Sequence, residues 1–133
     1  MSRIFKRIEN FNKAFDMFDE MQKNYLSDKM NNAYRLALTQ SFEIVCELAW
    51  KVLKDYLLLN NIEVQTPKDT VKKAFNSNII ENGQIWIDMV NDRNATSHEY
   101  NLEKVDLILE KIAATYYEEL IGFKKWLRGF DAK

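Results

Sequence analysis

Only three glycines and one proline occur in the 133 residues of this chain. Tight hairpin turns and Gly-rich phosphate loops depend on these residue types, so the chain has little material for either. The hydrophobic fraction of 47% is typical of a folded protein rather than a disordered one. We therefore expect a single domain over residues 1–133 with one hydrophobic core and no Rossmann turn.

Apolar side chains recur at steps of three, four or seven residues, which is the spacing of one face of an α-helix. No segment shows the alternation that is typical of a β-strand. The predicted helices cover about 3–26, 31–59 and 67–77, then run from 83 into the 90s and from 101 to a C-terminal stop at Gly129.

These helices predict an all-α protein, an up-and-down four-helix bundle with one extra short helix. The short helix has a clear start, with Thr66 as the N-cap and Pro67 at the first helical position. The helix predicted over 31–59 is apolar almost all round and should be central. Core positions are expected for most phenylalanines and for the three tryptophans, Trp50, Trp86 and Trp126.

The chain holds one cysteine, Cys46, and one histidine, His98. One Cys cannot form an internal disulfide, and one Cys with one His cannot supply a zinc site, so we expect no metal. We also expect no cofactor. A Cys46–His98 nucleophile pair is conceivable, but Cys46 lies in an apolar pattern and is interpreted as a buried filler.

The charge balance excludes a general attraction to nucleic acid or membranes. Nineteen basic and twenty acidic residues give a net charge of −1. The first residues carry no apolar signal region, and no apolar run approaches the ~20 residues of a membrane span. A cytoplasmic protein that does not bind membranes is the expectation.

A polar strip interrupts the apolar helix predicted over 31–59. Its residues step by three or four and share one face roughly 80° wide. One interpretation is a solvated strip with a favourable i,i+4 ion pair between Glu47 and Lys51. The other is that the strip lines a groove or a partner surface. Its members are Gln40, Glu43, Glu47, Lys51 and Lys54.

The polar segment Asn91–Asn101 follows an apolar helical run and holds the only histidine. Arg93 and His98 are five residues apart, which is about 140° around one continuous helix, so they would not share a face. Asn94 and His98, four apart, would share one. We expect the helix to end near His98, with Tyr100 just beyond it.

These residue types suit metal-independent cleavage of a phosphodiester. The His98 imidazole would abstract a 2′-hydroxyl proton, while Arg93 and Asn94 would bind the phosphate as charge builds. A purely structural interpretation stays open beside this one. In it, Arg93 pairs with Asp92 or with a carboxylate of the 31–59 helix, and His98 caps a helix.

Two motifs resemble known families. Arg93-Asn94, then His98 after three residues, then Tyr100, resembles the signature of HEPN-domain proteins encoded beside a minimal nucleotidyltransferase. The resemblance to nucleotidyltransferase substrate-binding proteins lies in their central helix and rests on Gln40–Glu43, Glu47–Lys51 and Leu53–Leu57. The resemblance covers nearly the whole chain, because the length, the helix order and both motifs agree with it.

The resemblance implies a HEPN four-helix bundle that homodimerises and pairs with a minimal nucleotidyltransferase, often as a toxin–antitoxin module. It implies RNA cleavage by Arg93 and His98 with Asn94 assisting, and silencing by adenylyl transfer from the partner to Tyr100. A two-histidine mechanism would need both copies of a dimer.

The resemblance also allows a non-catalytic role, as the substrate-binding subunit of a two-chain nucleotidyltransferase. In this role the surface around Glu43, Glu47 and Lys51 would face the partner or its substrate. Whether the chain is an enzyme stays open. It lacks the Gly-Ser signature of a nucleotidyltransferase, so we do not expect it to transfer nucleotides by itself.

Overall fold

The computed structural model describes residues 3–98 and 102–131, and these ranges contain helices and no strand. The predicted all-α class and the bundle are confirmed. The helices are α1 (Arg3–Ser27), α2 (Asn32–Leu59), α3 (Pro67–Asn76), α4 (Gly83–His98), α5 (Leu102–Lys111), the π-helix η1 (Ile112–Tyr116) and α6 (Tyr117–Asp131).

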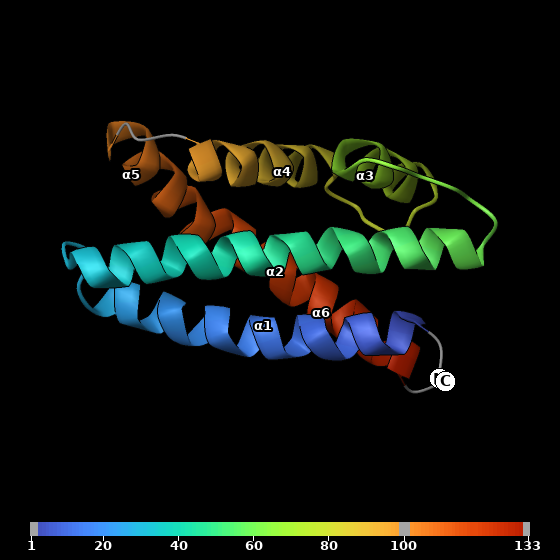
Figure 1. Cartoon of the computed structure of the whole chain (residues 1–133), viewed down its shortest axis with the longest axis horizontal. Coiled ribbons are helices and arrows are strands. Elements are labelled where there is room, and N and C mark those ends of the chain that lie inside the picture. The colour runs from blue at the N-terminus through green and yellow to red at the C-terminus, as the bar shows by residue number, and fades with distance from the viewer. Residues whose placement is uncertain (1–2, 99–101, 132–133) are drawn as a thin grey trace.

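Helix α2 runs through the middle of the bundle (Figure 1). It lies antiparallel to α1 on one side and to α4 on the other, and the short α3 packs against both α2 and α4. The segment α5–η1–α6 crosses behind α2, from the end of α4 towards α1. None of the helices in the described ranges is long and apolar enough to cross a membrane.

Aromatic rings fill much of the core between these helices. Phe18 of α1 packs on Phe42 of α2, which stacks on Tyr116 with ring centroids 5.6 Å apart. Nearer the other end of the bundle, Phe123 of α6 meets Phe11 of α1 edge to face at 5.3 Å. Burying a side chain of this size contributes about 1.5–3 kcal/mol. Burial of these aromatic side chains, which recur at helical spacing, therefore holds α1, α2 and α6 together.

Polar residues set the helix boundaries where the sequence predicts them. The side chains of Asn31 and Thr66 accept hydrogen bonds from backbone N–H groups of the helices that follow, each at 3.1 Å. The connectors after α2 and α3 each contain an asparagine with positive φ, Asn61 at 63° and Asn78 at 60°. Asparagine is among the residues that tolerate this conformation, so both turns are consistent with their sequence.

The C-terminal third of the chain departs from the prediction in two ways. The expected helix is interrupted by η1, and α6 continues through Gly129 to Asp131, so Gly129 is not a helix stop. A glycine inside a helix costs only about 1 kcal/mol relative to alanine, which the packing of α6 outweighs.

Two tryptophans also depart from the prediction: Trp126 is only half-buried, although it packs against the core, and Trp50 departs further. Trp50 is half-buried and lies outside the core cluster. Its indole N–H donates to Glu47 on the same helix, and the Lys54 ammonium lies 5.8 Å from the ring centroid. These polar partners account for a tryptophan at the protein surface.

Candidate functional site

A cluster of charged side chains forms where the second half of α4 lies along α2. The Glu47 carboxylate is at its centre and accepts a hydrogen bond from the Trp50 indole at 2.9 Å. Its oxygens also lie 3.4 Å from Lys51 Nζ and 3.5 Å from Arg93 Nη2. The polar strip of α2 and the Arg93 motif of α4 are therefore parts of one cluster, which spacing along the chain did not reveal.

This environment shifts the ionisation of Glu47. Burial alone would raise its pKa, but the hydrogen bond from Trp50 and the charges of Arg93 and Lys51 outweigh it and hold the pKa below its usual value. The side chains of Glu47 and Arg93 remain 31% and 32% exposed. The ion pair is thus partly open to solvent.

A second carboxylate, Asp92, ties α4 to the C-terminal segment. It accepts a hydrogen bond from the Tyr116 hydroxyl, and Lys111 Nζ lies 3.7 Å away. Burial and this hydrogen bond raise the pKa of Tyr116 well above its usual value. Asp92 and Arg93 are neighbours in sequence, yet they pair with different helices, so the last turns of α4 are held on two sides.

The π-helix η1 contributes to this arrangement. It ends at Tyr116, which reaches Asp92 on α4, while the next residue, Tyr117, donates to Asp19 on α1. Gln22 of α1 supports the π-helix, because its buried side chain donates to the Ala113 carbonyl at 2.7 Å. Such single-turn π segments frequently occur at functional sites.

The sequence-predicted residues fall as follows. Arg93 and Asn94 lie on α4, and Arg93 Nη1 is 3.4 Å from Asn94 Oδ1. His98 is the last residue of α4, as expected, although its side chain lies outside the described part of the molecule. Tyr100 lies outside the described residues altogether. The α2 strip places Glu43 half-buried, one turn before Glu47.

Helix α4 continues without a break from Arg93 to His98. Their positions on the helix backbone therefore lie about 140° apart around its axis, whereas the positions of Asn94 and His98 fall on the same face. The ion pair of the structural interpretation, between Arg93 and a carboxylate of the central helix, is present. A site that uses both Arg93 and His98 draws on two faces of α4.

Cys46 is buried beside this cluster, as predicted. Burial raises the pKa of its thiol to about 12, against a smaller opposing effect of Arg93. A neutral, buried thiol does not suit a nucleophile. Within the described ranges, no three His, Cys, Asp or Glu side chains are grouped so that they could hold a metal ion.

One of the comparisons with known proteins identifies a family, and another finds a similar fold. No curated protein matches the chain. The crystal structure of the protein ttk003001694 from Thermus thermophilus has a similar fold, with a TM-score of 0.72 and 27% sequence identity over 84% of this chain and 96% of that one. Residues 6–128 match the family described as nucleotidyltransferase substrate binding protein like. The chain therefore belongs to the family of nucleotidyltransferase substrate-binding-like proteins.

Proposed function

We propose that this chain is the HEPN-like component of a two-chain pair with a minimal nucleotidyltransferase, and that it is a toxin-like, metal-independent endoribonuclease. The observation that carries the proposal is the second half of α4. One uninterrupted helix holds Arg93 and Asn94 and ends at the only histidine, His98. A guanidinium, an amide and an imidazole are the groups that bind a phosphate and move a proton without a metal.

In the proposed reaction, His98 takes the proton of the ribose 2′-hydroxyl and the resulting oxygen attacks the adjacent phosphorus. The bond to the 5′-oxygen of the next nucleotide breaks, and that oxygen leaves with a proton. Arg93 and Asn94 stabilise the charge that builds on the phosphate. The products are a 2′,3′-cyclic phosphate and a 5′-hydroxyl end.

A homodimer would supply the second imidazole that this reaction uses to protonate the leaving oxygen. A two-fold axis brings the motif of each chain together, so His98 of one copy serves as base and His98 of the other as acid. The 140° separation of Arg93 and His98 on α4 supports this arrangement, because one chain alone does not place both on one face.

The test is cleavage of RNA by the purified chain in the presence of EDTA. Arg93→Ala and His98→Ala are expected to abolish cleavage and growth inhibition while the protein stays a folded dimer. Arg128→Ala, an exposed arginine on α6, is the matched control and is expected to cleave normally. Full cleavage by His98→Ala would overturn the mechanism.

The proposed control by the partner acts at Tyr100, two residues after His98. Adenylyl transfer from ATP would form a bond between the tyrosine oxygen and the α-phosphorus and release pyrophosphate. Intact-mass analysis after incubation with the partner and ATP is expected to show added adenylyl mass, absent from Tyr100→Phe and retained by Tyr34→Phe. Modification that survives in Tyr100→Phe would refute the assignment.

A second candidate function is the non-catalytic, substrate-binding subunit of a two-chain nucleotidyltransferase. The ion pair between Glu47 and Arg93 favours it, because the carboxylate already neutralises the group that would bind RNA phosphate. In this role the surface of Glu43, Glu47 and Lys51 meets the partner or its substrate. No RNA cleavage with or without the partner and ATP, together with partner binding lost in Glu47→Lys, would favour this subunit over the ribonuclease.

A further inference from the structure

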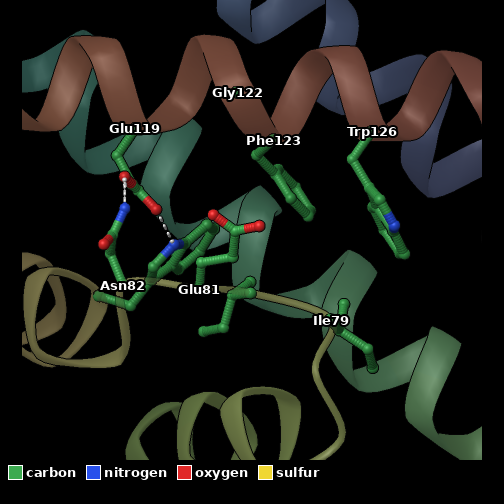
Figure 2. Close-up of a pocket in the computed structure, with 9 residues that line it drawn as sticks. Ile79, Glu81, Asn82, Glu119, Gly122, Phe123 and Trp126 are labelled. Carbon is green, nitrogen blue, oxygen red and sulfur yellow. Dashed lines mark hydrogen bonds between the residues drawn. The ribbon is translucent and has the colours of Figure 1, made fainter.

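A cavity of about 290 Å³ lies between α6, the start of α4 and the segment that precedes it. Four of its lining residues come from α6 at spacings of three, four and seven, so they share one face: Glu119, Gly122, Phe123 and Trp126. Figure 2 shows the side chains of Glu119, Phe123 and Trp126 extending from α6 towards the segment that carries Glu81 and Asn82.

The walls of this cavity are aromatic. Phe123 stacks on Trp126, with ring centroids 5.8 Å apart, and meets Trp86 edge to face at 5.2 Å. Tyr56 of α2 meets Trp126 edge to face, with ring centroids 5.0 Å apart. Trp126 is only half-buried, so part of its surface borders the open space. These contacts fix the positions of the rings that line the cavity.

Two carboxylates share the cavity with these rings. Glu119 is held in place by the Trp86 indole and the Asn82 amide, each donating to one of its oxygens at 3.0 Å. Glu81 is exposed, and its carboxylate reaches towards α6 (Figure 2). In the described parts of the chain, neither carboxylate forms an ion pair with a lysine or an arginine. The cavity therefore carries negative charge that the protein itself does not balance.

Gly122 leaves room for an occupant. A Cβ atom at this position would have no neighbouring heavy atom within 4 Å, so the helix surface is open here. The volume is near the lower end, about 300 Å³, of pockets that bind small molecules. The space suits a compact ligand rather than a polymer.

We infer that this cavity binds a small organic ammonium cation, between the carboxylates of Glu81 and Glu119 and the rings of Phe123 and Trp126. Aromatic faces and carboxylates both attract positive charge, and a cation with apolar substituents satisfies both at once. This site lies at the opposite end of α4 from Arg93 and does not depend on the proposed ribonuclease activity.

The probe is choline, followed by calorimetry and by the fluorescence of the tryptophans that line the cavity. Choline is expected to bind, and 3,3-dimethylbutan-1-ol, which has the same shape without the charge, is expected not to. Binding is expected to weaken as ionic strength rises. Equal binding of the neutral alcohol would show an ordinary apolar pocket, and no binding of choline would also overturn the inference.

Variants assign the binding to this cavity. Trp126→Leu is expected to lower the affinity about tenfold, the scale of a desolvated cation–π contact. Glu81→Gln removes one charge from an exposed position and is expected to weaken binding severalfold, and Gly122→Leu fills the space and is expected to abolish it. Glu118→Gln, next to Glu119 but outside the cavity, is the matched control. A loss in Glu118→Gln as large as in Glu81→Gln would mean general surface charge and sink the assignment.

Discussion

At each end of α4, a side chain of the helix binds a carboxylate of a neighbouring helix. The two ends differ in whether the partners of the carboxylates are neutral or charged. At the start, Trp86 donates to Glu119 of α6 among aromatic rings, and the donors that meet this carboxylate are neutral. At the end, Glu47 of α2 meets Arg93 and Lys51, and Asp92 meets Lys111. The start therefore keeps a negative charge beside an open cavity, whereas at the end each of these carboxylates meets at least one cation of the protein.

This difference bears on function. A site with unbalanced charge and open volume is ready for a ligand of opposite charge. A site whose arginine already pairs with a carboxylate acts on an anion only by exchanging one partner for another. The proposed ribonuclease therefore requires RNA phosphate to compete with Glu47 for Arg93, while the cavity at the start of α4 needs no such exchange.

The largest expected effect on folding is at the start of α4. Trp86 is 1% exposed, and Trp86→Ala is expected to lower the free energy of unfolding by about 3–5 kcal/mol because it leaves a large cavity. Equilibrium unfolding in urea measures this. Trp50→Ala is the matched control, since its indole also donates to a carboxylate but is half-buried. Equal losses in the two variants would contradict the contrast between the two ends.

A smaller loss is expected from removing one hydroxyl at the other end. Tyr116→Phe keeps the stacking on Phe42 and removes the donor to Asp92, which is expected to cost about 1–2 kcal/mol. Tyr117→Phe makes the same change at Asp19, which is more exposed than Asp92, 28% against 18%. Urea unfolding should show a smaller loss of unfolding free energy in Tyr117→Phe than in Tyr116→Phe. The reverse order would contradict the role of the Tyr116–Asp92 hydrogen bond in holding the end of α4.

Alanine substitutions at two glycines near the start of α4 are expected to change the free energy of unfolding in opposite directions. Gly122→Ala points a methyl group into open space and is expected to raise the free energy of unfolding by about 0.5–1 kcal/mol, the helix preference of alanine. Gly83→Ala would bring its Cβ within 2.9 Å of the Phe75 ring, so it is expected to lower stability. Thermal unfolding of both variants tests this. A stabilised Gly83→Ala would mean that Phe75 moves aside without cost.

Local spacing predicted most of the fold because helices are short-range structures. Thr66 and Pro67 mark the start of α3, and the period of the apolar residues marks the helices. Both signals come from residues that are close together in the sequence. The π-helix could not be predicted this way, because nothing in the composition of Ile112–Tyr116 distinguishes it from an α-helical turn. The burial of Trp50 was wrongly predicted, because the apolar pattern does not show which face is left uncovered.

The sites show the same limit more strongly. The motif around Arg93 could be found from residue types and spacing. The ion-pair partner of Arg93 could not be identified from the sequence beyond two candidates, Asp92 or a carboxylate of the central helix. That this carboxylate is Glu47 depends on how α4 lies along α2. The aromatic cavity was missed, because Glu81 and Glu119 are 38 positions apart in the chain and meet only in the folded bundle.

The smallest effect on stability is expected from removing the charge of Glu47 at the end of α4. Because the pKa of Glu47 is lowered in the folded protein, its ion pair stabilises the fold above the unfolded-state pKa of about 4.5, and this contribution is lost as pH falls through the lower folded-state value. Glu47→Gln removes that titration. At neutral pH the variant is expected to lose about 0.5 kcal/mol or less, as for other solvent-accessible pairs.

Below pH 4.5, the unfolding free energy of Glu47→Gln is expected to fall less steeply with pH than that of the unmodified chain. Glu43→Gln, one turn away on the same strip, leaves the pair with Arg93 in place and should keep the part of the slope that Glu47 contributes. An acid limb identical in Glu47→Gln and the unmodified chain would show that this ion pair does not form in solution. In that case Arg93 would meet RNA phosphate without an exchange of partners, and the contrast between the two ends of α4 would disappear.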